Sequence, residues 1–515
     1  MQPDSLVESK AVRQSVDPYA WYLLGVLMLV YIFNFVDRQL LAILAPELKR
    51  DLGISDSDFG FLYGTAFGVF YALFGIPLGK LADHWFRVRL LAIGFALWSL
   101  MTALSGLSKN FAQIAAARVG VGIGEATLSP CTYSLVSDYF PPHRRATALG
   151  LYSAGLYLGA GISLFLGSSI VAYWNAAYPS DTAPFGLAGW QAAFLFVGIP
   201  GFVMALWVAT LREPVRGAFD IVVVKTKAPD TAESSVWSQF FQDLIDIVPP
   251  FTILGAARRG GGALLVNLGI VACSSMMVGL LIAVSGDWAQ WIAFGVGCYA
   301  IASWMIAQRD REPEAFTTLF RSKAFMGVTL GYSLVSFVGY ANLGFAPLYA
   351  IQDLGADRAE AGFMLGSLGA LGGVIGVVGG GVLADRVARD GVHARRVLFI
   401  ASVAIAMMLG HAAMFSAASL SFFYPSVFVT MIFMSAALGG SSGTIVNIVP
   451  TELRGTATAV FLLGTNMIGL ALGPYTGGKL SVSIGDLGAG MLGLLFALPL
   501  TLGALLIAYR AMPKS

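Results

Sequence analysis

The run Gly79-Lys80-Leu81-Ala82-Asp83, which closes a long apolar segment, recurs as Gly381-Val382-Leu383-Ala384-Asp385 at the end of another. A second run, Arg145-Ala146-Thr147-Ala148, recurs at a similar offset as Arg454-Gly455-Thr456-Ala457. Two different motifs repeated at similar offsets indicate that the chain consists of two similar halves. We therefore interpret the sequence as two copies of one helical unit whose loops differ in length.

The composition is that of a protein that crosses a membrane many times. Of the 515 residues, 57% are hydrophobic and only 12% are charged, and the mean hydropathy is +0.76. The apolar segments run for about 20 residues, which is the length a helix needs to cross the hydrocarbon core of a bilayer. We predict an all-α polytopic membrane protein, and the net charge of +2 gives no sign of a nucleic-acid partner.

The predicted membrane-spanning segments form two groups of six with a pair between them. In the first half they cover residues 20–46, 59–81, 89–107, 111–137, 146–173 and 190–211. In the second half they cover residues 325–351, 361–384, 397–418, 422–450, 456–480 and 489–509. Residues 262–284 and 289–307 form an additional central hairpin, which brings the total to fourteen. A two-helix insertion leaves both halves in the same orientation.

This pattern divides the chain into five regions. They are a cytoplasmic segment 1–19, a six-helix bundle 20–212, a central linker 213–320, a second six-helix bundle 321–510 and a cytoplasmic tail 511–515. Within the linker, apolar residues at helical spacing over about 236–250 predict an amphipathic helix on the cytoplasmic membrane surface, and a helix that binds a partner is the alternative.

Loop charges predict the orientation of the chain. With both termini in the cytoplasm, the outward loops hold only five of the 31 lysines and arginines, namely Lys49, Arg50, Lys109, Arg358 and Lys479. This distribution follows the positive-inside rule. No Asn-x-Ser/Thr glycosylation signal occurs in the sequence, so we expect a bacterial inner membrane.

The repeated Gly-x-Leu-Ala-Asp motif resembles the signature of the major facilitator superfamily, which reads Gly-x-Leu-Ala-Asp-Arg followed by a basic cluster. The first copy departs from it with His84 and Phe86, and in the second copy the basic cluster comes later, at Arg395-Arg396. The resemblance covers both groups of six segments and implies two six-helix halves that rock about a central site. The cytoplasmic residues that we expect to latch one conformation are Asp83, Arg87, Arg145, Asp385 and Arg454; an ordinary solvated turn is the alternative.

Four charged residues stand inside predicted spans of the first half. They are Asp37 and Arg38 in the first segment and Arg118 and Glu125 in the fourth. A charged side chain at the centre of a membrane helix costs about 3 kcal/mol or more, so such residues usually have a partner and a function. From helix geometry we expect Asp37, Arg38 and Arg118 at one depth and Glu125 about 10 Å deeper.

These residue types suggest proton coupling. Burial favours the protonated form of a carboxyl group, whereas a neighbouring arginine favours the ionised form, so Asp37 and Glu125 are candidate proton carriers. With both acids protonated, Arg38 and Arg118 would leave a positive site for an anionic headgroup. The alternative is a static structural brace made of buried ion pairs.

The second half lacks charged residues well inside its spans. A central cavity would therefore have one charged and one apolar wall, which suits an amphiphile better than a sugar. The candidate polar residues of this cavity are Tyr31, Asn34, His411, Asn447 and Asn466. A histidine that only satisfies core hydrogen bonds is the alternative for His411.

A closer resemblance rests on three stretches. Asn34-Phe35-Val36-Asp37-Arg38, Arg118 with Gly124-Glu125-Ala126, and Ser137-Asp138-Tyr139-Phe140 resemble the spinster family of lysolipid and sphingolipid transporters, in a bacterial form. That resemblance implies roles for Asp37 and Glu125 in proton coupling, with the headgroup site beside them.

Two other families remain open. The first and fourth segments also resemble organic anion:proton symporters, and fourteen segments are typical of drug:proton antiporters. The antiporter pattern Gly-x-x-x-Gly-Pro-x-x-Gly-Gly stands here at 469–478 in the eleventh segment rather than in the fifth. At this position it predicts a close helix contact with a bend at the proline.

Taken together, these features predict a proton-coupled secondary transporter of an amphiphilic lipid such as a lysophospholipid. We expect no enzyme activity, because the four histidines are scattered and no nucleophile–base pair or metal-binding cluster is apparent. We expect no cofactor other than the coupling protons. The expected partners are the bilayer and the amphiphilic substrate, and we expect a monomer.

Overall fold

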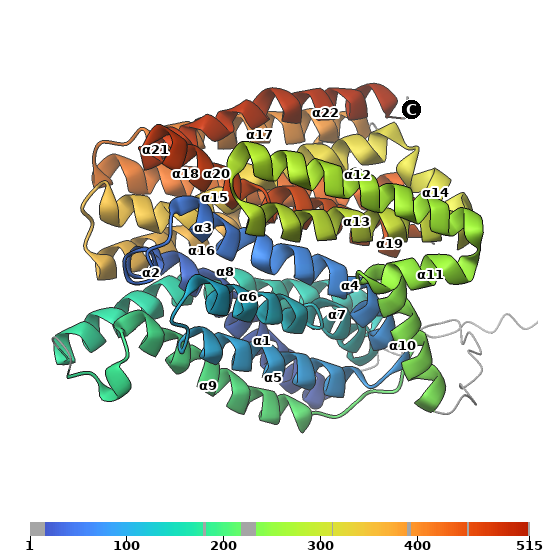
Figure 1. The fold of residues 1–515 in the computed structure, drawn as a ribbon, viewed down its shortest axis with the longest axis horizontal. Coiled ribbons are helices and arrows are strands. Elements are labelled where there is room, and N and C mark those ends of the chain that lie inside the picture. Colours follow the sequence, from blue (N-terminus) through green and yellow to red (C-terminus); the bar gives the residue numbers. More distant parts are fainter. Residues whose placement is uncertain are drawn as a thin grey trace, which may run out of the picture.

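The computed structural model describes residues 16–178, 182–217, 233–311, 313–388, 393–450 and 453–512 of the chain. Within these ranges the regular secondary structure is entirely helical. Most of the long helices run roughly side by side across Figure 1. The predicted fold class, an all-α protein with two six-helix halves and an extra central pair, is confirmed.

The first half contains six helical passes, four of them interrupted or flanked by short helices. The elements are α1 (Pro18–Ile43), α2 (Ala45–Leu52), α3 (Asp56–Gly60), η1 (Phe61–Thr65), α4 (Ala66–His84), α5 (Arg87–Ser105), α6 (Phe111–Glu125), α7 (Leu128–Tyr139), α8 (Pro142–Ala177), η2 (Pro184–Gly186) and α9 (Gly189–Ala209). Here α3, η1 and α4 form the second pass, and α6 and α7 form the fourth.

The linker and the second half follow. The linker elements are α10 (Glu233–Ile247), α11 (Phe251–Arg259), α12 (Gly261–Ser285), α13 (Trp288–Arg311) and α14 (Pro313–Phe320). The second half contains α15 (Lys323–Gln352), α16 (Arg358–Val387), α17 (His393–Phe415), α18 (Leu420–Ile448), α19 (Arg454–Gly464), η4 (Thr465–Leu470), α20 (Gly473–Ile484), α21 (Leu487–Gly493), η5 (Leu494–Phe496) and α22 (Ala497–Ala511). The eleventh pass is α19, η4 and α20 together.

Thirteen helical stretches of the described residues are long and apolar enough to cross a membrane. The fourth predicted segment is not among them, because it is divided into α6 and α7, each too short to span alone. Pro130 accounts for the break, since it has no N–H to donate to the carbonyl of Ala126 four residues earlier. At the same break, the Thr127 hydroxyl donates to the Gly124 carbonyl at 2.9 Å.

The two halves contact each other closely at one end of the bundle. This is the end carrying α2 and α3, which the sequence predicts to face outward, and we call it the outer end (Figure 1). There Arg358 forms an ion pair with Glu47, and the Ser481 hydroxyl donates to Asp56 at 2.7 Å.

Glycines on α8 and α16 show the same asymmetry between the two ends. A Cβ at Gly161 or at Gly366 would overlap the backbone of the other, whereas a Cβ at Gly150, Gly379 or Gly381 would meet no atom within 4 Å. The halves are therefore in close contact where Gly161 meets Gly366, whereas the glycines nearer the opposite, predicted cytoplasmic, end have open space beside them.

The hairpin α12–α13 packs where the second and eleventh passes meet. The Thr65 hydroxyl lies 2.6 Å from Oε1 of Gln290 on α13 and 2.5 Å from the carbonyl oxygen of Ala471, between η4 and α20. The Trp291 ring packs edge-on against Tyr475 with centroids 5.3 Å apart. Figure 1 shows α13 between α12 and the rest of the bundle, so α13 joins the hairpin to both halves.

Both passes that receive the hairpin contain a π-helical turn, η1 in one and η4 in the other. Such turns insert one extra residue into a helix and often mark functional positions. The eleventh-pass glycines pack closely as the sequence predicts, since a Cβ at Gly473 would overlap Phe337 and one at Gly478 would overlap Asp56.

The first helix described in the linker is α10, which the sequence predicts at about 236–250. It packs against α4 and α13 at the predicted cytoplasmic end. Lys80 of α4 forms an ion pair with Asp243 at 2.7 Å, and Trp85 packs edge-on against Trp237 with centroids 5.2 Å apart. The predicted position of α10 on a membrane surface stays a prediction.

Candidate functional site

A buried charged cluster lies inside the first half, between α1, α4, α5 and α6. Nε of Arg38 donates to Oε2 of Glu125 at 2.8 Å, and Glu125 is completely buried. The Arg38 guanidinium also lies over aromatic rings, 4.4 Å from the centroid of Phe67 and 5.0 Å from that of Tyr71. Aromatic faces stabilise a cation that has lost most of its water.

The other two members of the cluster are held less tightly. Nε of Arg118 lies 3.4 Å from the carbonyl oxygen of Leu62. Its guanidinium carbon lies 5.3 Å from the centroid of the Phe67 ring, so both arginines lie near this ring. Asp37 is buried, and one of its carboxylate oxygens has no hydrogen-bond partner. Its carboxylate is close enough to interact electrostatically with Arg118 and Glu125.

The structure corrects the expected depths. Glu125 does not lie apart from the other three charges, because it forms the direct ion pair with Arg38. Two glycines explain the approach of these helices. A Cβ at Gly122 would overlap the Phe67 carbonyl, and a Cβ at Gly124 would overlap Gly94 and Trp98. The glycines of the Arg118–Glu125 run thus bring α4 and α5 against α6.

A cavity lies between the two halves, next to this cluster. It is lined from α1 and α8 on one side and from α15, α16 and α18 on the other. Its volume is about 140 Å³, below the ~300–1,000 Å³ of typical ligand sites. A larger substrate would therefore require the halves to move apart. The polar side chains in its lining are Gln39, Tyr332, Ser336, Tyr340, Asn342 and Ser435, and the lining includes no charged residue.

Two residues connect the cluster with the cavity. Phe35 lines the cavity, and its ring centroid lies 5.3 Å from the Arg38 guanidinium carbon. Tyr340 lines the cavity from the other half and is close enough to interact electrostatically with Arg38. The Arg38 side chain keeps 15% of its surface exposed, whereas the Glu125 side chain is fully buried. Arg38 thus lies close to two residues of the cavity lining, Phe35 and Tyr340.

The five polar residues predicted for the cavity do not line it. Tyr31 stacks on Tyr152 with centroids 4.3 Å apart, and Asn34 is buried beside Glu125. Asn447 is exposed and donates to its own helix, to the Gly443 carbonyl at 2.7 Å.

The two remaining candidates are buried in the second half. Asn466 lies in the π-helical turn η4. His411 lies between α15 and α21, with Nδ1 2.7 Å from Oδ1 of Asn342 and Nε2 2.8 Å from the Met491 carbonyl oxygen. His411 therefore reaches the cavity only through Asn342, which does line it.

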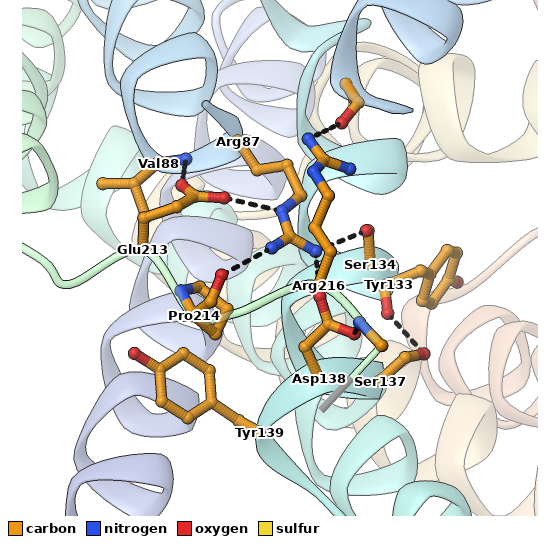
Figure 2. A network of polar contacts seen from close by, with 12 residues as sticks. Arg87, Val88, Tyr133, Ser134, Ser137, Asp138, Tyr139, Glu213, Pro214 and Arg216 are labelled. Atoms are coloured by element: carbon orange, nitrogen blue, oxygen red, sulfur yellow. Dashed lines mark hydrogen bonds and ion pairs between the residues drawn. The ribbon is translucent and has the colours of Figure 1, made fainter. Parts of the chain in front are cut away.

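Figure 2 shows a second polar network at the predicted cytoplasmic end of the first half. Its centre is Arg87, which is fully buried at the start of α5 and forms ion pairs with Asp138 of α7 and Glu213, the latter at 2.7 Å. Arg87 also donates to the Ser134 hydroxyl at 2.8 Å and to the Pro214 carbonyl at 3.2 Å.

The segment after α9 completes this network. Glu213 accepts from the Val88 N–H at 2.8 Å. Arg216 donates to the carbonyls of Ala82 and Trp85 at the end of α4, at 2.8 and 2.5 Å. Burial and the nearby positive charge of Arg87 lower the pKa of Arg216 from its usual range. The loop thereby ties together the ends of α4, α5 and α7.

The predicted latch residues occupy different settings. Asp83 is exposed, and Arg216 rather than Asp83 caps the end of α4. Arg145 donates to the Phe140 carbonyl at 3.1 Å, and Asp385 forms an ion pair with Arg396 at 2.9 Å. Arg454 begins α19, and its side chain lies outside the described residues. Each of the contacts just described lies within one half, so a latch between the halves stays a prediction.

Sequence reasoning missed Glu213 and Arg216 as members of these networks, and it did not include Asn342 among the candidate residues of the cavity. Glu213 and Arg216 fall in a loop, where the sequence has no periodic signal that would single them out. Asn342 was visible as a polar residue inside an apolar segment, which is a signal for function in a membrane helix.

Comparisons with known proteins agree with this architecture. The family model described as Major Facilitator Superfamily matches residues 27–474 and 328–515. An MFS-type efflux pump of Mycolicibacterium smegmatis is 28% identical over 503 residues, covering 95% of this chain and 91% of the pump. Protein spinster of Drosophila melanogaster is 29% identical over 42% of this chain and 33% of its own length. A probable L-galactonate transporter of Escherichia coli is 28% identical over 40% of this chain and 41% of its own length.

Solved structures show the same fold. A bacterial homolog of the human lysosomal transporter spinster, in an inward-facing and unoccupied conformation, superposes with a TM-score of 0.71 at 23% identity, covering 96% of this chain and 98% of that one. A POT family transporter superposes with a TM-score of 0.65 at 14% identity, covering 96% and 97%. The resemblance to the spinster family predicted from the sequence is thereby confirmed.

Proposed function

The chain belongs to the Major Facilitator Superfamily, and from this premise we propose that it is a proton-coupled secondary transporter that carries an amphiphilic lipid by alternating access. The lipid has one acyl or sphingoid chain and an anionic or zwitterionic headgroup. One observation carries the proposal: the Arg38 guanidinium, which is paired with Glu125, lies 5.3 Å from the ring of Phe35, and Phe35 lines the cavity.

Charge arithmetic supports the coupling. When Asp37 and Glu125 are ionised, the cluster with Arg38 and Arg118 is neutral. When both acids bind protons, the arginines leave a positive charge of about two, which would attract an anionic headgroup. Proton binding at Glu125 would release Arg38 from its ion pair, so that the guanidinium becomes available to the cavity. This sequence links the arrival of protons to the binding of the headgroup.

The uncharged lining supports an amphiphile. Leu156, Leu164, Leu343, Leu365 and Met431 are among its apolar residues, and burial of a hydrocarbon chain against such side chains contributes about 0.8 kcal/mol for each CH₂ group. A small polar acid would leave this surface without a partner.

A second candidate is export of a drug-like compound. It is favoured by similarity to the mycobacterial efflux pump over nearly the whole chain. Uptake of an organic acid is a third candidate, because the chain resembles probable galactarate/D-glucarate transporters. The similarity to one of them covers 74% of this chain.

Binding to the purified full-length protein distinguishes these candidates. The ligands are a panel of lysophospholipids, a panel of sugar acids and a set of cationic dyes, each measured at pH 5.5 and pH 7.5. We expect lysophospholipids to bind, more tightly at pH 5.5. Binding of sugar acids alone, or of dyes alone, would refute the lipid proposal in favour of the corresponding alternative.

A further inference from the structure

His411 lies between two groups that both accept hydrogen bonds. Its Nδ1 is 2.7 Å from Oδ1 of Asn342 and its Nε2 is 2.8 Å from the carbonyl oxygen of Met491. A neutral imidazole has one N–H and one lone pair, so it can donate to only one of them. The ring must therefore either carry a second proton or receive a donor from Asn342.

The surroundings of the ring favour the neutral form. His411 is completely buried, and its aromatic neighbour is Phe415, with centroids 5.2 Å apart. Within the described residues, the helices packed against α17 place no carboxylate, lysine or arginine in a hydrogen bond or ion pair with the ring. A buried imidazolium without a counter-ion is costly.

A neutral His411 then determines how the Asn342 amide is oriented. The Met491 carbonyl can only accept, so Nε2 of His411 keeps the hydrogen and Nδ1 keeps the lone pair. The Asn342 amide satisfies this lone pair by donating from Nδ2, which turns its Oδ1 to the opposite side. The two amide atoms of asparagine are close to isosteric, so this half-turn needs no movement of the helix.

Asn342 lines the cavity, and the amide atom opposite His411 has no hydrogen-bond partner. The Ser336 hydroxyl, on the same helix and in the same lining, is also buried without a partner. A buried polar group without a partner costs about 1–3 kcal/mol. A ligand that supplies the missing hydrogen bond gains this free energy on binding.

We propose that Asn342, oriented by His411, is a hydrogen-bond acceptor in the cavity wall that binds a free hydroxyl group on the backbone of the substrate. This inference rests on the proposed function and narrows it to single-chain lipids with a backbone hydroxyl, as in a lysophospholipid or a sphingoid lipid. A hydroxyl fits better than an ammonium group, because the cavity lining includes no carboxylate to pair with a cation. His411 acts here as a positioning residue.

The test compares two lipids that differ in one hydroxyl. The probes are 1-palmitoyl lysophosphatidic acid and its 2-deoxy analogue, bound to the full-length protein in nanodiscs. We expect the wild type to bind the hydroxyl lipid about 2- to 12-fold more tightly, which corresponds to one neutral hydrogen bond. In Asn342→Leu this ratio falls to about 1, while affinity for the deoxy analogue stays the same.

His411→Leu tests whether His411 orients the Asn342 amide. It also serves as the test variant if Asn342→Leu does not fold. It leaves Asn342 in place but removes the group that orients its amide, so the preference for the hydroxyl lipid falls although both lipids still bind. Thr501→Val is the control, because Thr501 is buried in α22 and bonds only to the Ala497 carbonyl of its own helix.

Three results would overturn the inference. Equal binding of both lipids by the wild type refutes it and leaves the lipid proposal intact, as does a preference that survives in both variants. If neither lipid binds and sugar acids or dyes bind instead, both the proposed function and this inference are refuted.

Discussion

Nε of Arg38 on α1 lies 2.8 Å from a carboxylate oxygen of Glu125 at the end of α6, so that the first and fourth passes are joined by a single ion pair. The pair is asymmetric, because Glu125 is completely buried whereas Arg38 retains some exposure next to the cavity. Its loss therefore has different consequences depending on which partner is removed.

Arg38→Met should destabilise the protein markedly. It leaves Glu125 buried without its cation, and breaking a buried ion pair in this way typically costs about 3–5 kcal/mol. The double variant Arg38→Met/Glu125→Met should recover most of this loss, because no unpaired charge remains. The measurement is the midpoint of thermal unfolding in detergent. Equal midpoints for the single variant and the wild type would contradict the structural role of the pair.

Asp37→Asn should keep the fold and weaken the response of lipid binding to pH. Asp37 is buried and one of its oxygens has no hydrogen-bond partner, so an isosteric neutral amide removes a buried charge at little cost. We expect lysophospholipid binding to depend less on pH between 5.5 and 7.5 than in the wild type, because Glu125 remains as a proton carrier, with an unfolding midpoint at or above that of the wild type. A variant that keeps the full pH response would exclude Asp37 as a proton carrier.

Arg87→Met should loosen the cytoplasmic end of the first half. It removes the cation from between Asp138 and Glu213, at an expected cost of about 3 kcal/mol or more. The loop after α9 then loses its attachment, and trypsin should cleave it faster at Arg212 or Arg216. The proteolysis rate of Arg89→Met, which changes an exposed arginine of the same helix, should match that of the wild type.

Gln290→Leu should favour opening at the outer end. It removes the contact between the hairpin and Thr65, while the hairpin stays attached to the second half through Asp287 and Lys479, 2.8 Å apart. Spin labels at Lys109→Cys and Ser419→Cys, both exposed at the outer end, should report a larger share of long distances by double electron–electron resonance.

That experiment uses a background in which Cys131, Cys273 and Cys298 are replaced by serine. Met276→Leu, at an exposed position of α12, is the control and should leave the distance distribution unchanged. An unchanged distribution in Gln290→Leu as well would show that the hairpin does not restrain the two halves.

Asp353→Asn should stabilise the protein in a pH-dependent way. Partial burial of this otherwise exposed carboxyl group, with the negative charges of Asp486 and Asp56, raises the pKa of Asp353 above its usual range. A carboxyl group whose pKa rises on folding destabilises the fold above that pKa, and the effect disappears as the pH falls through it. The unfolding midpoint should therefore increase at pH 7.5 and stay unchanged at pH 4. An equal increase at both pH values would exclude this electrostatic cause.

Much of the architecture could be predicted from the sequence because bilayer thickness and backbone hydrogen bonding restrict what an apolar segment can do. The recurrence of Gly79–Asp83 at Gly381–Asp385 indicated two related halves, and Asp37, Arg38, Arg118 and Glu125 stood out because charges are rare in membrane helices. The break before Pro130 was missed, although the proline itself was visible in the sequence.

The pairing of side chains was decided only by the tertiary structure. Helical periodicity predicts which residues share a face of one helix, but not how neighbouring helices are rotated and shifted relative to each other. Glu125 therefore pairs with Arg38, although depth estimates along isolated helices placed it elsewhere. By the same reasoning, Asn342 rather than His411 lines the cavity.

The sequence by itself determined that this chain is an all-α membrane protein with two six-helix halves, a central hairpin and buried charges in one half, because hydrophobic length and the cost of burying charge are local properties. Only the tertiary structure decided that Arg87 holds Asp138 and Glu213 together, that α13 contacts both halves and that Asn342 faces the cavity. These contacts join segments far apart in the chain, and their geometry depends on packing between helices.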